Sequence, residues 1–133
     1  MKSGPSTVVA CICLASAGCD VAGLSTLNDK WVQNGDAAQG RALVASGSFG
    51  CAACHAIPGV VAPKGVAGPP LSGVARRALI AGQLPNKPEV LVAFLRNPPA
   101  LVPLTGMPDV GLTTEQARDV VAYLYTLEAA HGR

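Results

Sequence analysis

The chain has 133 residues, of which 14% are charged and 4% are aromatic, and its formal net charge is +2. This length suits one small domain, and the scattered lysines and arginines argue against nucleic-acid binding. The 11 prolines and 15 glycines predict many loops and turns. Because few aromatic side chains are available to fill a core, we expect a covalent staple or a large buried cofactor to supply the rest.

Residues 1–19 predict a targeting segment, and residues 20–34 predict a polar linker. The apolar stretch over 7–17 is shorter than the roughly 20 apolar residues of a membrane-spanning helix. The "SAGC" that ends at Cys19 resembles a bacterial lipoprotein box, whose cysteine is lipidated after cleavage. A signal cleaved elsewhere and an uncleaved anchor are the alternatives. Under each of them the domain over 35–133 lies outside the cytoplasm.

The first helix of this domain is expected to begin after a cap at residues 34–36 and to run to about Ser46. Its expected inward face carries Ala37, Gly40 and residues 42–44. A glycine in mid-helix costs about 1 kcal/mol relative to alanine. Gly40 therefore indicates that another element approaches the helix closely.

Residues 50–59 read "GCAACHAIPG", in which Cys51 and Cys54 are three apart and His55 follows directly. The pattern C-x-x-C-H is the attachment signature of c-type haem. The two thiols add to the two vinyl groups of the macrocycle, and the adjacent histidine donates its Nε2 to the iron as one axial ligand. The motif predicts one covalent haem, which would also fill the core.

Three other chemistries compete for the same cluster. A structural zinc site needs about four ligands, but no cysteine follows Cys54. A thioredoxin-like dithiol needs a βαβ context, which the sequence does not suggest. A disulfide that closes so short a ring would add little stability and would leave His55 without a role. The haem interpretation is the favoured one.

The middle of the chain alternates loops with short helical patterns. Residues 57–73 are rich in proline and glycine and predict an extended loop. Residues 74–82, "VARRALIAG", predict a short helix that stops at a glycine. A longer helix is expected to begin near Pro88 and to end at Pro98, and another proline-punctuated loop follows over 100–111.

The last helix has the clearest signals. Thr113 is an N-cap with Gln116 three residues on, which is a capping box. The helix is expected to run to about Ala130. Its apolar residues repeat at helical spacing: Ala117, Val120, Val121, Leu124 and Leu127. Since no pair of strands is expected, the predicted fold class is all-α with long loops.

A second axial ligand is suggested by Met107, the only methionine besides Met1. It lies between Gly106 and Pro108, and a rigid loop that presents a thioether suits a haem ligand. The plainer alternative is a side chain that fills a gap in the core. The rival ligand is His131, close to the C-terminus.

Over about residues 35–130 the chain resembles the class I cytochrome c family. The features that carry this resemblance follow in the family's order: Gly40, "CAACH" at 51–55, "GPPL" at 68–71, "GMP" at 106–108 and Tyr123. The resemblance implies about four short helices and long loops wrapped around one covalently attached haem c. It also implies that Gly40 packs against Tyr123, and that the Pro69 carbonyl accepts a hydrogen bond from His55 Nδ1–H.

Residues 68–127 look more specifically like the cytochrome c domain fused to subunit II of some bacterial haem–copper oxidases. No copper-site domain accompanies them here, so we expect a free or anchored relative. In that family an arginine near Arg76 and Arg77 neutralises a haem propionate, the alternative being a solvated pair on a helix face. Outside the leader only Lys30, Lys64 and Lys87 are lysines, which argues against salt-steered docking.

The expected function is electron transfer and not enzymatic catalysis. With His55 and Met107 both on the iron, the haem would cycle between Fe(III) and Fe(II) and carry single electrons between membrane respiratory complexes, with a haem–copper oxidase as the expected acceptor. The expected location is the periplasmic side of a bacterial inner membrane, anchored through the N-terminal segment or soluble. The alternatives are a haem subunit held in a membrane oxidoreductase complex, and a five-coordinate sensor or peroxidase if Met107 does not ligate.

Overall fold

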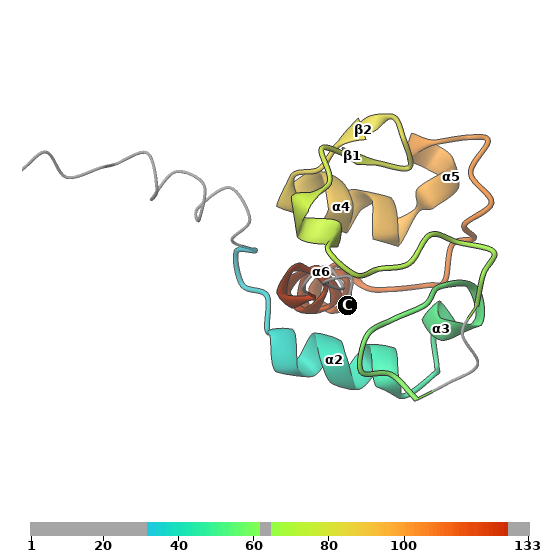
Figure 1. Cartoon of the computed structure of the whole chain (residues 1–133). Helices are drawn as coiled ribbons and strands as arrows, with labels where there is room; N and C mark the ends of the chain where they lie inside the picture. The colour runs from blue at the N-terminus through green and yellow to red at the C-terminus, as the bar shows by residue number, and fades with distance from the viewer. Residues whose placement is uncertain (1–31, 62–64, 128–133) are drawn as a thin grey trace, which may run out of the picture.

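The computed structural model describes residues 32–61 and 65–127. In this part of the chain helices dominate, which confirms the expected class, and a very short pair of strands is added to them (Figure 1). The leader with Cys19, the linker as far as residue 31, and His131 lie outside the described residues. The elements in chain order are α2 (Ala37–Ala45), α3 (Cys51–Cys54), the 3-10 helix η1 (Val74–Arg76), β1 (Leu79–Ile80), β2 (Leu84–Pro85), α4 (Pro88–Arg96), α5 (Pro98–Leu101) and α6 (Thr114–Thr126).

Helix α6 lies at the centre, with α2 on one side and α4 with the strand pair on the other (Figure 1). Asp36 caps α2 as expected, because its carboxylate accepts from the backbone N–H of Ala38 at 2.8 Å and of Gln39 at 3.2 Å. The carboxylate of Asp119 on α6 accepts in turn from Asp36 N–H at 2.8 Å. A hydrogen bond therefore joins the start of α2 to α6, in addition to the apolar packing between the two helices.

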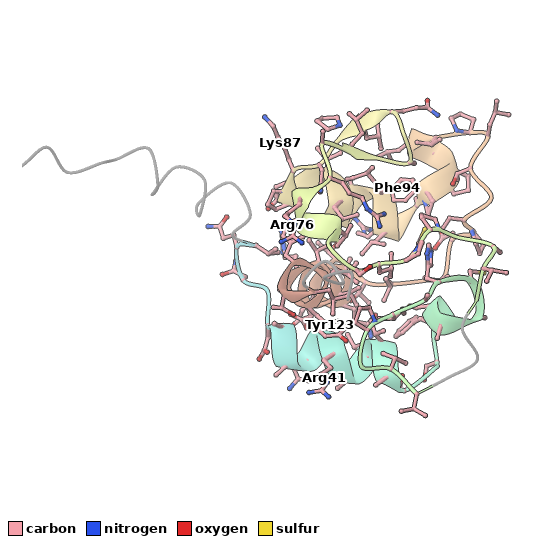
Figure 2. All side chains as sticks on the ribbon, viewed as in Figure 1. Arg41, Arg76, Lys87, Phe94 and Tyr123 are labelled. Atoms are coloured by element: carbon pink, nitrogen blue, oxygen red, sulfur yellow. The ribbon has the colours of Figure 1, made fainter. Side chains whose placement is uncertain are left out.

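Gly40 explains how closely these two helices approach each other. A Cβ at this position would lie 2.9 Å from the Cβ of Tyr123 and closer still to the Asp119 carbonyl of α6. The contact between Gly40 and Tyr123, which the family resemblance implied, is present, and Figure 2 shows Tyr123 on the side of α6 that faces α2. The mid-helix glycine is needed because backbone meets backbone there.

The capping box of α6 is complete. Thr113 Oγ1 accepts from Gln116 N–H at 3.2 Å, and the Gln116 side chain accepts from Thr113 N–H at 3.0 Å. The helix ends at Thr126, and the three residues that follow Leu127 in the predicted helix lie outside the described part. Its buried face matches the predicted spacing, with Ala117, Val120, Val121, Tyr123 and Leu124 inside.

Helix α4 begins at Pro88 as expected and ends at Arg96. Its apolar stripe is buried against α6, with Leu91, Val92, Phe94 and Leu95 inside. Pro98 does not simply end this helix: it is the first residue of α5, whose cap is Asn97, accepting from Ala100 N–H at 3.1 Å. A proline at a first helical position loses nothing, because its missing N–H would have had no partner.

The prediction of a helix over 74–82 is wrong. Only η1 forms, and the chain leaves helical geometry at Arg77, where φ is −71° and ψ is 139°. The rest is the hairpin of β1 and β2, whose turn has positive φ at Ala81 and Gly82. Asn86 Nδ2 donates to the carbonyls of Val74 and Arg77, which a continuous helix would have used itself.

The inward face of α2 also differs from expectation at one residue. Gly40 and Val44 are buried, and Ala37 and Leu43 pack against the core, but Ala42 is exposed.

Among residues 32–61 and 65–127, none of the helices is long and apolar enough to cross a membrane.

Candidate haem-binding site

The short helix α3 carries the cysteine pair. It begins after Gly50, whose φ of 65° is left-handed, and it consists of the four residues from Cys51 to Cys54. Residues three apart share a helix face, so both thiols are presented on one side of this turn. Both are half-buried and free, without a disulfide between them. Burial raises the pKa of the Cys51 thiol above its ordinary value.

His55 follows α3 in extended backbone, with φ of −114° and ψ of 139°. Its half-buried ring places Nδ1 2.7 Å from the carbonyl oxygen of Pro69. Because a carbonyl can only accept, Nδ1 carries a proton, and in the neutral imidazole Nε2 then keeps its lone pair. The histidine is thus held in the tautomer whose Nε2 can coordinate a metal.

Gly65 and Gly68, whose close contacts the sequence did not predict, build the cradle around this turn. A Cβ on Gly68 would lie 2.6 Å from His55 Nδ1 and 2.9 Å from Nε2, so only a glycine leaves room for the imidazole. A Cβ on Gly65 would lie 2.5 Å from the carbonyl carbon of Ala53 in α3. Two glycines three apart, shortly after the cysteine motif, are the sequence signal that could have pointed to this close approach.

Backbone hydrogen bonds hold the loop over 65–71 against the motif. Gly65 N–H donates to Ala52 at 3.1 Å, Gly68 N–H to Cys54 at 2.8 Å and Leu71 N–H to Ala56 at 2.9 Å. These three bonds place Pro69, which lies between the last two donors, beside the imidazole. The structure thus brings Cys51, Cys54, His55 and Pro69 into one cluster.

Met107 lies in the loop between α5 and α6, half-buried and packed against the hydrophobic core. Its backbone N–H donates to Thr105 Oγ1 at 3.2 Å, which fixes the turn that leads into it. In the view of Figure 1 this loop and the loop that follows α3 run on the same side of the molecule. The rival ligand His131 lies outside the described residues, and ligation by Met107 stays a prediction.

Arg77 is engaged with the same loop that carries Pro69. Its guanidinium donates to the Pro70 carbonyl and, at 3.5 Å, to the Ser72 carbonyl. Arg76, one residue earlier, is exposed on η1, and Figure 2 shows it above α6. The two arginines therefore differ: Arg77 is hydrogen-bonded to the loop, and Arg76 lies at the surface.

The donor set fits a covalently attached haem better than the alternatives. Two free thiols on one face of a turn, followed by an imidazole with an unprotonated Nε2, are what thioether attachment and iron ligation require. Zinc is not supported, since no group of three or more His, Cys, Asp or Glu side chains gathers within the described ranges. Gly68, which makes room for the imidazole, belongs to the same cradle.

Comparison with known proteins agrees with this geometry. A search of curated proteins gave no match. The family model for cytochrome c matches residues 37–128, which include α2, the cysteine motif, Pro69, Met107 and α6. This match covers more than half of the 133 residues. The chain therefore belongs to the cytochrome c family, whose domain binds covalently attached haem c and transfers electrons.

Proposed function

We propose that this cytochrome c carries single electrons between membrane respiratory complexes, with a haem–copper oxidase as acceptor. Haem c supplies the one-electron Fe(III)/Fe(II) couple when it is bound. The observation that carries the proposal is the 2.7 Å contact between His55 Nδ1 and Pro69 O, because it leaves Nε2 free for the iron. Cys51 and Cys54 on α3 would hold the macrocycle beside that nitrogen.

Met107 is the proposed second axial ligand. Two features restrain its loop at this point: Thr105 Oγ1 accepts from Met107 N–H, and Pro108 follows directly. With a thioether as well as an imidazole on the iron, the haem would favour Fe(II) more than it would with two histidines, and no position would stay open for oxygen or peroxide. This coordination makes the protein a carrier; an open position would make it a sensor or a peroxidase.

The ligation is tested with Met107→Ala against the matched variant Leu104→Ala, whose side chain is 97% exposed in the same loop. In the oxidised state, wild-type protein and Leu104→Ala should show the near-infrared thioether-to-iron band, and in the reduced state they should not bind CO readily. Met107→Ala should lose the band and bind CO. A wild-type protein that lacks the band and binds CO is no simple carrier. The intact mass of the native protein reports haem addition, leader removal and acylation of Cys19 together.

The proposed docking surface lies beside the cysteine motif and is apolar. Val61 and Val66 are fully exposed on the loop that packs against α3 through Gly65. The chain also has few lysines outside its leader. Short-lived apolar docking to a membrane-bound partner, such as the oxidase that the resemblance of residues 68–127 suggests, is expected to depend little on salt.

The docking surface is tested by the rate of electron transfer to a haem–copper oxidase as ionic strength is varied. Wild-type protein should show a nearly flat salt dependence, and Val66→Lys should slow the reaction. Leu79→Lys is the matched control, because this 48% exposed side chain lies on the hairpin and not beside α3. A steep salt dependence, or equal effects of the two lysines, contradicts the proposed surface.

The proposed location is the periplasmic side of a bacterial inner membrane. Cytochrome c domains are typically extracytoplasmic, and residues 1–19 read as a signal peptide or a lipidated anchor. An anchor would confine the haem domain to the membrane surface and raise its effective concentration near membrane partners. Co-purification with a membrane complex in detergent would instead identify a stably bound subunit.

A further inference from the structure

Asn86 is the one buried polar side chain of the described core, at 7% exposed. Its Nδ2 donates to Val74 O at 2.7 Å and to Arg77 O at 2.8 Å, and its Oδ1 accepts from Tyr125 O–H at 2.8 Å. One carboxamide therefore joins the exit of the hairpin, the end of η1 and helix α6. A buried amide with all these partners fixes one arrangement of the segments, because losing a partner leaves a desolvated polar group.

Arg77 connects this cluster to the loop that contacts His55. The backbone carbonyl of Arg77 accepts from the Asn86 amide, and the guanidinium of Arg77 donates to the carbonyls of Pro70 and Ser72. Pro69 and Pro70 have no N–H of their own. Their carbonyls are therefore the only backbone groups of these two residues that can form hydrogen bonds, and both do so. The Pro69 carbonyl accepts from His55, and the Pro70 carbonyl accepts from Arg77.

We propose that Asn86 and Tyr125 act as positioning residues which, through Arg77, hold the Pro69 carbonyl against His55 and so set the reduction potential. The inference rests on the proposed ligation of iron by His55 Nε2. The chain of contacts runs without a gap from α6 to the imidazole: Tyr125, Asn86, Arg77, Pro70, Pro69 and His55. Neither Asn86 nor Tyr125 is a ligand; each acts on the iron only through the strength of one hydrogen bond.

The sign of the effect separates this role from a purely electrostatic one. A strong Nδ1–H···O=C bond makes the imidazole more basic and favours Fe(III), which lowers the potential. Loosening the Pro69 carbonyl should therefore raise the potential. Removing positive charge near the iron would do the reverse, since it favours the more positive oxidation state. Arg77→Lys keeps the charge but loses the planar fork, so a rise in its potential reports positioning alone.

The test measures the reduction potential and the proton resonance of His55 Nδ1–H in the reduced holoprotein. Asn86→Ala should shift the equilibrium constant for reduction up to tenfold, which for one electron is about 59 mV upward. Tyr125→Phe and Arg77→Lys should shift it about twofold in the same direction. In each variant the Nδ1–H resonance should move toward that of a weaker hydrogen bond. Lys87→Gln, an exposed neighbour of Asn86, is the control and should change neither quantity.

The outcomes are decisive even if one variant fails to fold, because Tyr125→Phe removes only a hydroxyl. Potentials and Nδ1–H resonances that stay at the wild-type values in Tyr125→Phe and Arg77→Lys overturn the proposal. The same holds if stability falls in both variants while the potential stays constant, since the cluster would then be only structural. A wild-type holoprotein without a ligated His55 Nδ1–H resonance would instead refute the proposed function on which the inference rests.

Discussion

Gly68→Ala is the sharpest single test of the cradle around His55. The added Cβ would lie 2.6 Å from Nδ1 and 2.9 Å from Nε2 of the imidazole. An ordinary contact between such atoms is about 3.5 Å, and Cε1 of the ring lies closer to the added Cβ than Nδ1 does, so the ring has to retreat by at least about 0.9 Å. A displacement of this size away from the loop over 65–71 would take Nδ1, now 2.7 Å from the Pro69 carbonyl, out of hydrogen-bonding distance.

Two costs follow from this displacement. Overpacking a well-filled site costs about 1–3 kcal/mol, and losing a hydrogen bond costs about 0.5–1.5 kcal/mol more. We therefore expect Gly68→Ala to lower the free energy of unfolding by about 1.5–4.5 kcal/mol. The reduction potential of the folded fraction should also rise, because the weakened Nδ1–H bond makes the imidazole less basic.

The assay is chemical denaturation of the holoprotein, followed by haem absorbance, together with redox titration. Gly106→Ala is the matched control, since this glycine has no neighbour within 4 Å of an added Cβ and has no left-handed backbone. It should change stability by no more than about 0.5 kcal/mol. A Gly68→Ala protein with wild-type stability and potential would show that the imidazole does not depend on this glycine, and the reasoning would be wrong.

Three further outcomes are expected from other parts of the fold. Gly40→Ala should lower the unfolding midpoint in urea even though alanine gains about 1 kcal/mol of helix propensity, because its Cβ would meet the α6 backbone; a stabilised variant contradicts the close packing. Ala81→Gly should stabilise the protein by about 0.5–1 kcal/mol in the same assay, since Ala81 is left-handed with φ of 49°; a loss of stability would show that the turn does not strain it. Burial raises the pKa of Tyr125 to about 12 from 10, so the folded state keeps a proton that the unfolded chain releases above pH 10. Stability should then fall as pH rises from 10 toward 12, and this fall should be smaller in Tyr125→Phe.

The parts of the fold that the sequence predicted well are those with local signals. The cap at Asp36, the proline at the start of α4 and the capping box of α6 each depend on residues within one helical turn. Such interactions form wherever the chain is helical, so their residue types can be recognised without tertiary information. The cysteine motif is equally local, and the family match over 37–128 agrees with it.

The hairpin could not be predicted in the same way, because a distant side chain decides it. Residues 74–82 have a helical composition, but Asn86 and Tyr125 take part in a cluster that ends η1 early. The turn residue Ala81 carries no turn signal, since alanine rarely adopts a left-handed backbone. The same limit applies to Gly65 and Gly68, whose close neighbours are revealed only when the loop folds back onto α3.

The described residues divide into a framework that packs by itself and a cradle that does not. Helices α4 and α6 bury apolar stripes against each other, and α2 meets α6 backbone to backbone at Gly40. Helix α3 has no fully buried residue: Cys51 and Ala52 are only partly buried against the core, and hydrogen bonds hold the helix to its loop and to the turn before it. A four-residue helix is far too short to be stable alone. The two thioether bonds from Cys51 and Cys54 would tie this turn to the core, which is a physical reason for covalent attachment in so small and so weakly aromatic a protein.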